Sequence, residues 1–279
     1  MSRSPVARRE LVLVGAGRMG SALLEGWIKA GLVSKSSPAE VVEPSPPESL
    51  RKRINEGLAK LVAASTIDAL RPKLVVLAVK PQVLDAALRE LKPLTESGAA
   101  FLSIAAGKTI ASISSALGDA PVVIRSMPNL PASVGAGVTA VVAGPGVDAA
   151  LKAQADALLG AVGKVVWLDD EGLIDAVTAI SGSGPAYVFN LVEALAAAGL
   201  AIGLPKEAAE SLARETIIGA AALLKTSADS PAALRQAVTS PGGTTEAALK
   251  VLMGEAGLTP LMRKAAEAAL KRAKELGKG

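Results

Sequence analysis

Two glycine-rich turns in this sequence have the residue types needed to bind an anion, and they lie near opposite ends of the chain. The first is GAGRMG, with glycine at positions 15, 17 and 20, and the second is SPGGTT, residues 240–245. A helix-forming pattern follows each turn, and the first turn of a helix presents backbone N–H groups that have no partner inside the helix. The chain is therefore expected to hold two anionic groups at separate positions.

The first turn stands in a context that favours a dinucleotide. It follows the apolar run LVLV and opens an amphipathic segment. Gly15 would allow the tight turn, Gly17 the approach of a pyrophosphate, and Gly20 the close packing of helix on strand. Lys80 follows a later apolar run, and we expect it either to face the crevice at the carboxyl ends of the strands or to be a solvated charge in a turn. SIAAG (103–107) ends the next strand in small residues, which leave room for a nicotinamide ring.

Glu43 leaves the choice between NADH and NADPH open. It ends the predicted strand 39–43, where an acidic residue usually accepts the ribose hydroxyls and repels a 2′-phosphate. Two unit charges about 4 Å apart repel each other by about 4 kcal/mol at an effective dielectric constant of about 20. Alternatively, Glu43 is a solvent-exposed strand end that points away from the ligand. Compensation for its charge could come from Ser45, Arg18, Arg51, Lys52 and Arg53.

The residue inventory excludes several kinds of chemistry. The chain has 279 residues, half of them apolar, and contains neither histidine nor cysteine. A thiol nucleophile, a disulfide and histidine acid–base chemistry are thus excluded, and we expect no metal site. The 30 basic and 26 acidic residues form no basic stripe with aromatics, so we expect no nucleic acid partner. The N-terminal residues carry no apolar signal region, and we expect a soluble, cytoplasmic protein with no membrane partner.

The order of the predicted elements indicates two domains. Over residues 1–170, short apolar runs alternate with amphipathic segments, and we expect strands at 11–15, 39–43, 73–79, 99–106, 121–127, 137–143 and 163–169. Several are apolar at consecutive positions, so this half predicts an α/β, Rossmann-type doubly wound sheet. Over residues 171–279 helix starts recur with proline in the first turn, which predicts an all-helical domain. Its alanine- and leucine-rich helices are buried either internally or, as we favour, in a dimer interface.

Two stretches of the helical half resemble a known family. DAVTAISGSGPAYVFNLVEAL (175–195) and VTSPGGTTEAAL (238–249) are similar to the signature regions of the pyrroline-5-carboxylate reductases. GAGRMG, LAVKP, SIAAG and IRSMPNLPA resemble that family in order and spacing, so the resemblance covers nearly the whole chain. It implies NAD(P)H-dependent reduction of the cyclic imine Δ1-pyrroline-5-carboxylate to L-proline, the last step of proline biosynthesis, by a homodimer or larger homo-oligomer. Arg18 and Glu43 depart from the family's pattern, which puts the cofactor preference in question.

The resemblance also implies a role for individual residues. The substrate carboxylate would lie on the second turn, and the implied substrate-binding residues are Gly242, Gly243, Thr244, Thr245 and Glu171. Thr245 and Ser240 are the implied catalytic residues: the Thr245 hydroxyl would hydrogen-bond the ring nitrogen, and the Ser240 hydroxyl would help to fix the carboxylate. The implied contacts to NADPH or NADH are Val14, Gly15, Ala16, Gly17, Arg18, Met19, Ser45, Ala78, Val79, Lys80, Pro81, Ile104, Ala105 and Ala106. Because a protonated imine accepts hydride without a strong acid on the protein, the lack of histidine is no obstacle.

From the residues alone, other interpretations stay open. SPGGTT could be a loop in which Gly243 or Thr244 caps the next helix, and in SGSGPAY Ser183 or Gly184 could cap a helix that begins at Pro185. One alternative function is that of another two-domain dehydrogenase, acting on a different imine or on a hydroxy acid with Lys80 as base. A non-catalytic dinucleotide sensor is the other, but a sensor has no need of SPGGTT in a separate domain.

Overall fold

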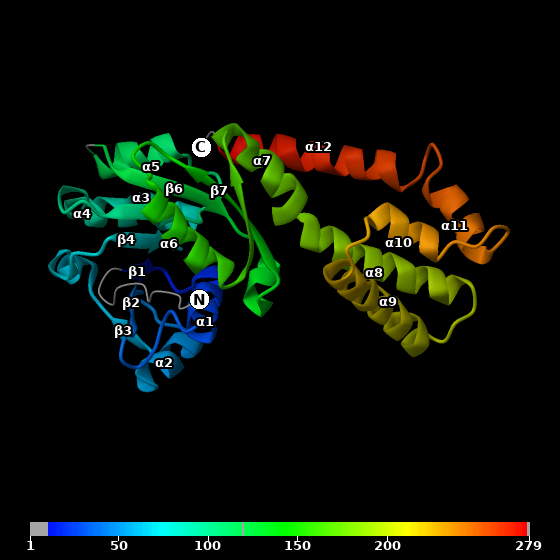
Figure 1. Cartoon of the computed structure of the whole chain (residues 1–279), viewed down its shortest axis with the longest axis horizontal. Helices are drawn as coiled ribbons and strands as arrows, with labels where there is room; N and C mark the ends of the chain where they lie inside the picture. The colour runs from blue at the N-terminus through cyan, green and yellow to red at the C-terminus, as the bar shows by residue number, and fades with distance from the viewer. Residues whose placement is uncertain (1–10, 119, 278–279) are drawn as a thin grey trace. The chain divides into compact units, whose positions relative to one another are not determined.

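The chain folds into two compact units, which a computed structural model describes over residues 11–118 and 120–277, apart from the side chains of Asp68 and Leu70. Residues up to Gly182, together with those from Leu270 on, form the first unit, and Ser183–Ala269 form the second (Figure 1). The division falls later than position 171 because residues 171–182 pack on the first unit. Ile174 is buried in its core, and Asn129 Nδ2 donates to the Ser181 carbonyl at 3.1 Å.

Within the described residues, the first unit is built on an eight-stranded sheet with the order β3-β2-β1-β4-β5-β6-β7-β8. Its strands are β1 (Leu11–Val14), β2 (Ala39–Val42), β3 (Ala59–Leu61), β4 (Leu74–Leu77), β5 (Ala100–Ser103), β6 (Val122–Met127), β7 (Gly137–Ala143) and β8 (Gly163–Leu168). Neighbouring strands run parallel except β6 and β7, which are antiparallel. The expected doubly wound sheet is confirmed, and β3 is an additional strand at the sheet edge that its short AKL pattern does not predict.

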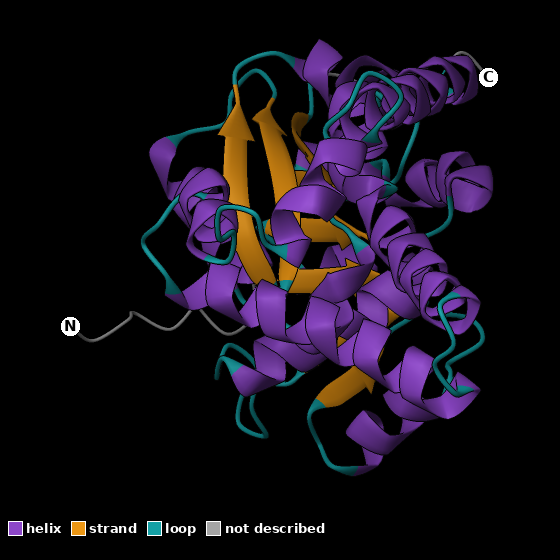
Figure 2. Cartoon of the chain, turned by 90° about the vertical axis from the view of Figure 1, so that its right-hand side faces the viewer, coloured by secondary structure: helices purple, strands orange, loops and turns teal. Residues whose placement is uncertain are grey.

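Helices cover both faces of this sheet (Figure 2). They are α1 (Arg18–Lys29), α2 (Glu48–Asn55), α3 (Pro81–Leu91), α4 (Pro93–Glu96), α5 (Ile110–Leu117) and α6 (Ala149–Gly160), with the 3₁₀ turns η1 (Ala64–Leu70), η2 (Leu130–Val134) and η3 (Glu171–Leu173). α1 and α6 pack on one face, whereas α3 and α5 pack on the other. Successive strand residues face opposite layers, as Leu13 and Val14 do, which explains why the strands are apolar at consecutive positions.

A helical stretch with a bend at Ser183 leads into the second unit. It comprises α7 (Ile174–Val177), the π-helical turn η4 (Thr178–Gly182) and α8 (Gly184–Ala201). Ser183 stands at the N-cap position of α8, as one of the two alternatives expected, but its side chain makes no capping hydrogen bond. The remaining helices are α9 (Lys206–Thr226), α10 (Pro231–Ala237), α11 (Thr244–Leu252) and α12 (Leu258–Leu276), of which α12 ends in the first unit.

The second unit exposes a large apolar surface. α8 and α9 lie side by side, and the residues buried on them are small, namely Ala196, Gly199, Ala209 and Ala213 (Figure 1). Larger apolar side chains remain in solvent: Phe189 is 56% and Leu223 58% exposed. By length and composition alone, the helical stretch Glu171–Ala201 could cross a membrane. Exposed apolar surfaces of this kind mark protein–protein or membrane interaction sites.

Candidate functional site

The carboxyl ends of four neighbouring strands meet at one edge of the sheet and form the nucleotide side of the site. Backbone hydrogen bonds join the residues that follow these strands. Gly15 N donates to the Val42 carbonyl at 2.9 Å, and Ala78 N donates to the Val14 carbonyl at 2.7 Å. On the other side of β4, Ile104 N donates to the Leu77 carbonyl at 3.1 Å. The predicted nucleotide residues from GAGRMG, LAVKP and SIAAG are therefore brought to a single edge.

A Cβ atom would have different surroundings at each glycine of the first turn. Gly15 has φ +95°, and a Cβ there would lie 2.8 Å from the Ala78 carbonyl carbon. A Cβ at Gly20 would lie 2.2 Å from the Gly15 carbonyl oxygen, so only glycine allows α1 to pack against the turn. A Cβ at Gly17 would meet no atom within 4 Å and would project into the open space in front of the turn. That space, at the uncapped N-terminus of α1, suits a pyrophosphate.

A cavity of about 400 Å³ opens beside this turn. Its lining comprises Val14, Gly15, Gly17, Val42, Glu43, Pro44, Ala64, Ala78, Val79, Lys80, Val83, Ala87, Glu90 and Leu91. Six predicted nucleotide residues are among them, whereas the other eight do not line this cavity. The apolar walls from η1 and α3 could accommodate a flat base, and sequence patterns gave no sign that these helices contribute.

The side chain of Glu43 is fixed at the mouth of the cavity by two backbone amides. Its Oε2 accepts from Ala16 N at 2.8 Å, and its Oε1 accepts from Ser45 N at 3.0 Å. The carboxylate thus lies against the glycine turn. The alternative that Glu43 is a strand end pointing into solvent is wrong.

The basic side chains that follow β2 are not equally available to a ligand. Arg53 donates twice to Glu25 and once to Glu56, and these hydrogen bonds raise the pKa of Arg53 further above its already high value. Arg51 Nε donates to the Pro46 carbonyl at 3.0 Å, which places Arg51 beside the turn. Arg18 is exposed at the start of α1.

The second glycine turn lies in the second unit and is also held by an acidic side chain. Gly242, at φ +70°, donates its N–H to Glu246 Oε2 at 2.8 Å, and Gly243 N donates to the Ser240 carbonyl at 3.0 Å. Gly243 is the N-cap of α11 and offers no side chain to its first turn, so the capping role considered for Gly243 is confirmed. The amides of Thr244 and Thr245 lie in that first turn, where no intrahelical carbonyl is available to them. The turn therefore offers the threonine amides to an anion, and the two glycine amides serve the turn itself.

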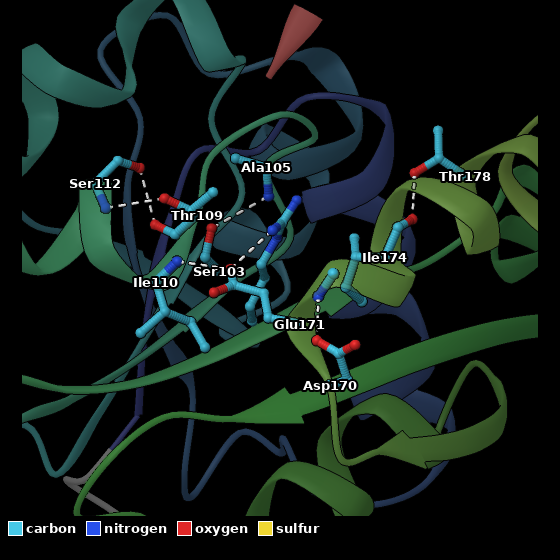
Figure 3. Close-up of polar contacts among 11 residues, drawn as sticks. Ser103, Ala105, Thr109, Ile110, Ser112, Asp170, Glu171, Ile174 and Thr178 are labelled. Atoms are coloured by element: carbon cyan, nitrogen blue, oxygen red, sulfur yellow. Dashed lines mark hydrogen bonds and ion pairs between the residues drawn. The ribbon is translucent and has the colours of Figure 1, made fainter. Parts of the chain in front are cut away.

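Glu171 is engaged inside the first unit. Its Oε1 accepts from Ile110 N at 2.8 Å and from Arg125 Nη1 at 2.7 Å; Figure 3 shows the carboxylate directed at the start of α5. The Arg125 side chain is 5% exposed and that of Glu171 28%. The contact at Ile110 places a negative charge on the N-terminus of α5, which is favourable for the helix dipole. These contacts assign Glu171 a structural role, whereas the substrate contact implied by the family resemblance stays a prediction.

The sequence pattern does not identify two residues of IRSMPNLPA that hold other segments in place. Arg125 lies in the buried strand β6, and Asn129 links two segments by donating to the Ser181 carbonyl and accepting from Val138 N at 2.9 Å. The available signal was a charged residue within the apolar run VVIRSM, because a buried charge requires a partner. Nothing in the sequence pattern identifies Glu171 as that partner.

Comparison with known proteins covers both units. Residues 171–276 match the family model described as pyrroline-5-carboxylate reductase dimerisation, and residues 10–107 match the one described as NADP oxidoreductase, coenzyme F420-dependent. The pyrroline-5-carboxylate reductase of Pseudomonas aeruginosa is 41% identical over 95% of this chain and 96% of its own. The chain belongs to the pyrroline-5-carboxylate reductase family. The enzyme of that name from Synechocystis is 39% identical, over 96% of this chain and 98% of its own.

Solved structures agree with this membership. That of a pyrroline-5-carboxylate reductase from Coxiella burnetii superposes with a TM-score of 0.89 at 39% identity, covering 96% of this chain and 98% of that one. The Plasmodium falciparum pyrroline carboxylate reductase, solved with NADP bound, has a TM-score of 0.78 at 28% identity and covers 96% and 98% of the two chains. The two-domain α/β fold, the oxidoreductase class and the use of NAD(P)H follow for this protein.

The contacts of Glu171 lead to a stability prediction. Glu171→Ala is expected to lower the free energy of unfolding by about 3 kcal/mol, because it leaves Arg125 buried without its carboxylate. Combining Glu171→Ala with Arg125→Met should recover a large part of this loss, because no unpaired charge then remains. Denaturant unfolding followed by circular dichroism, at one protein concentration, measures both effects.

Asp175→Asn, on the neighbouring helix α7, is the control for removal of an acidic group near this contact. An equal loss in the single and the double variant would contradict the structural role of the ion pair. A raised KM for the imine in Glu171→Ala, without a loss of stability, would instead support a substrate contact.

Proposed function

We propose that this protein catalyses the NAD(P)H-dependent reduction of Δ1-pyrroline-5-carboxylate to L-proline. The observation that carries the proposal is the similarity over nearly the full length to reductases of this name, at 41% identity for the Pseudomonas aeruginosa protein. The first unit supplies a glycine turn and cavity suited to a dinucleotide, and the second supplies a separate anion-binding turn. Two separate anion-binding turns match an enzyme that binds two reactants, each with an anionic group.

The second turn binds the carboxylate of the imine in this proposal. Thr244 and Thr245 contribute their backbone amides, and the positive end of α11 favours the negative charge. Gly242 and Gly243 act indirectly, because their amides already hold the turn in shape. Ser240 is exposed beside the turn, where its hydroxyl can add a further donor to the carboxylate.

The Thr245 hydroxyl orients the imine. Its side chain is half-buried at the start of α11, one residue from the first amide of the helix. A hydroxyl there accepts a hydrogen bond from the protonated ring nitrogen while the carboxylate is held by the adjacent amides. The bound nicotinamide supplies the hydride, and the protein contributes position and orientation, which do not require an acid of its own.

The second unit forms the contact between subunits in a soluble, cytoplasmic homodimer or larger homo-oligomer. The match to a dimerisation model and the exposed apolar residues on α8 and α9 support this assignment. A groove of about 730 Å³ runs between these helices and is lined in part by Val188, Phe189, Ile217 and Ile218. A second copy of α8 and α9 would cover this groove.

The activity is tested together with the role of Thr245. The purified protein is expected to oxidise NADH or NADPH with pyrroline-5-carboxylate, in parallel initial-rate assays with each cofactor. Thr245→Ala should lower kcat/KM by roughly tenfold to a hundredfold, because one oriented hydrogen bond to the reacting ring is lost. Thr245→Ser keeps the hydroxyl and should retain most of the rate.

Cofactor affinity and melting temperature of Thr245→Ala serve as its controls, and both should match the wild type. Wild-type kinetics in Thr245→Ala would refute the role of this hydroxyl. Turnover of a hydroxy or keto acid without turnover of the imine would refute the proposed reaction, and cofactor binding without turnover of any imine would favour a sensor.

The oligomer is tested by one charge in the groove. Ile218→Glu is expected to shift the protein towards monomers in sedimentation velocity, because a carboxylate that a second copy covers loses its hydration. Lys206→Gln, on the solvated start of the same helix, is the matched control. A monomeric wild type, or an Ile218→Glu variant with unchanged mass, would contradict the assignment of this face.

A further inference from the structure

We propose that Glu43 makes the nucleotide site select NADH over NADPH. The inference rests on the proposed function only in that the cavity beside the first glycine turn holds the cofactor.

Glu43 is positioned as a hydrogen-bond acceptor for the ribose next to the base. Both carboxylate oxygens accept one backbone N–H each, from Ala16 and Ser45, so the group cannot rotate away from the glycine turn. A carboxylate has about four lone-pair sites, and two remain after these bonds. A ribose with free 2′- and 3′-hydroxyls matches them as a pair of donors.

The turn after Glu43 offers a 2′-phosphate no free backbone amide, and its donor is the Ser45 hydroxyl. Its sequence is PSPP, and Pro44, Pro46 and Pro47 have no backbone N–H to donate. Ser45 has the one backbone amide of these four residues, and that amide already donates to Glu43 Oε1 at 3.0 Å. A phosphate on the 2′-oxygen would thus meet the carboxylate where it requires a donor.

The cations that could offset this repulsion are partly engaged. Arg53 is bound to Glu25 at 2.7 Å and also to Glu56. Arg51 lies beside the turn, where its Nε donates to the Pro46 carbonyl. Arg51 is exposed, and its charge is screened by solvent, whereas the Glu43 carboxylate is held against the turn. Arg18 and Lys52 are exposed, so solvent screens their charges too. Lys80 lines the cavity together with the two acidic residues Glu43 and Glu90, whose negative charges offset its positive charge.

Binding measurements without substrate test the selection directly. Titration of NADH and NADPH into the wild-type protein, by calorimetry or by nicotinamide fluorescence, should give a Kd that is roughly tenfold to a hundredfold lower for NADH. Glu43→Gln removes the charge, keeps an acceptor for one of the two amides and should bring the two Kd values within about threefold of each other. Glu43→Ser also frees the Ser45 amide and should reverse the preference, with Arg51→Gln abolishing that reversal.

Glu48→Gln is the matched control, since it removes an exposed carboxylate five positions away, in the first turn of α2, and should leave the ratio of Kd values as in the wild type. Melting temperatures show that each variant is folded. Tighter binding of NADPH by the wild type would overturn the proposal, as would an unchanged ratio in both Glu43 variants. Because no imine is present, a protein that selects NADH but fails to reduce pyrroline-5-carboxylate would refute the function and leave this inference standing.

Discussion

The parallel alignment of β1, β2, β4 and β5 is the constraint on which the nucleotide side depends. It brings four carboxyl ends to one edge, and the first residues beyond them are joined by backbone hydrogen bonds between Gly15 and Val42, Ala78 and Val14, and Ile104 and Leu77. Because Gly15 approaches Ala78 so closely, a side chain at position 15 would separate these strand ends. The cavity, the position of Glu43 and the start of α1 all follow from this one edge.

Both glycine turns are held in shape by an acidic side chain of their own unit. Glu43 accepts from Ala16 N in the first turn, and Glu246 accepts from Gly242 N in the second. In each case the acidic side chain occupies one backbone amide of the turn, while amides of the following helical turn have no intrahelical partner. The acid therefore fixes the turn and also limits what it can bind. Glu43 lines the cavity beside the first turn, whereas Glu246 lies on α11, whose first amides we propose as the site of the substrate carboxylate.

The sequence predicts the sheet well because strands such as β1 and β4 contribute to the core on both faces and are consequently apolar at consecutive positions. It predicts less where a contact joins distant segments. The three residues of β3 have too little pattern to identify them, and the pairing of Arg125 with Glu171 spans 46 positions. Ser183 occupies the N-cap position that the local signal offers, but its backbone is helical after the π-helical turn and its side chain makes no capping hydrogen bond. Local patterns therefore locate the glycine turns but do not identify the acidic side chains that hold these turns in shape.

The direction of the Glu43 side chain shows why such contacts matter for function. As a strand-end residue it could have pointed into solvent, and Arg51, Lys52 and Arg53 could then have formed a phosphate site. The glycine turn decides between these outcomes, because Ala16 has an amide that faces the end of β2 and a carboxylate satisfies it. Arg53 instead donates two hydrogen bonds to Glu25 on α1. The packing of α1 and α2 beside β2 thus places the Glu43 carboxylate at the glycine turn and holds the Arg53 guanidinium away from it.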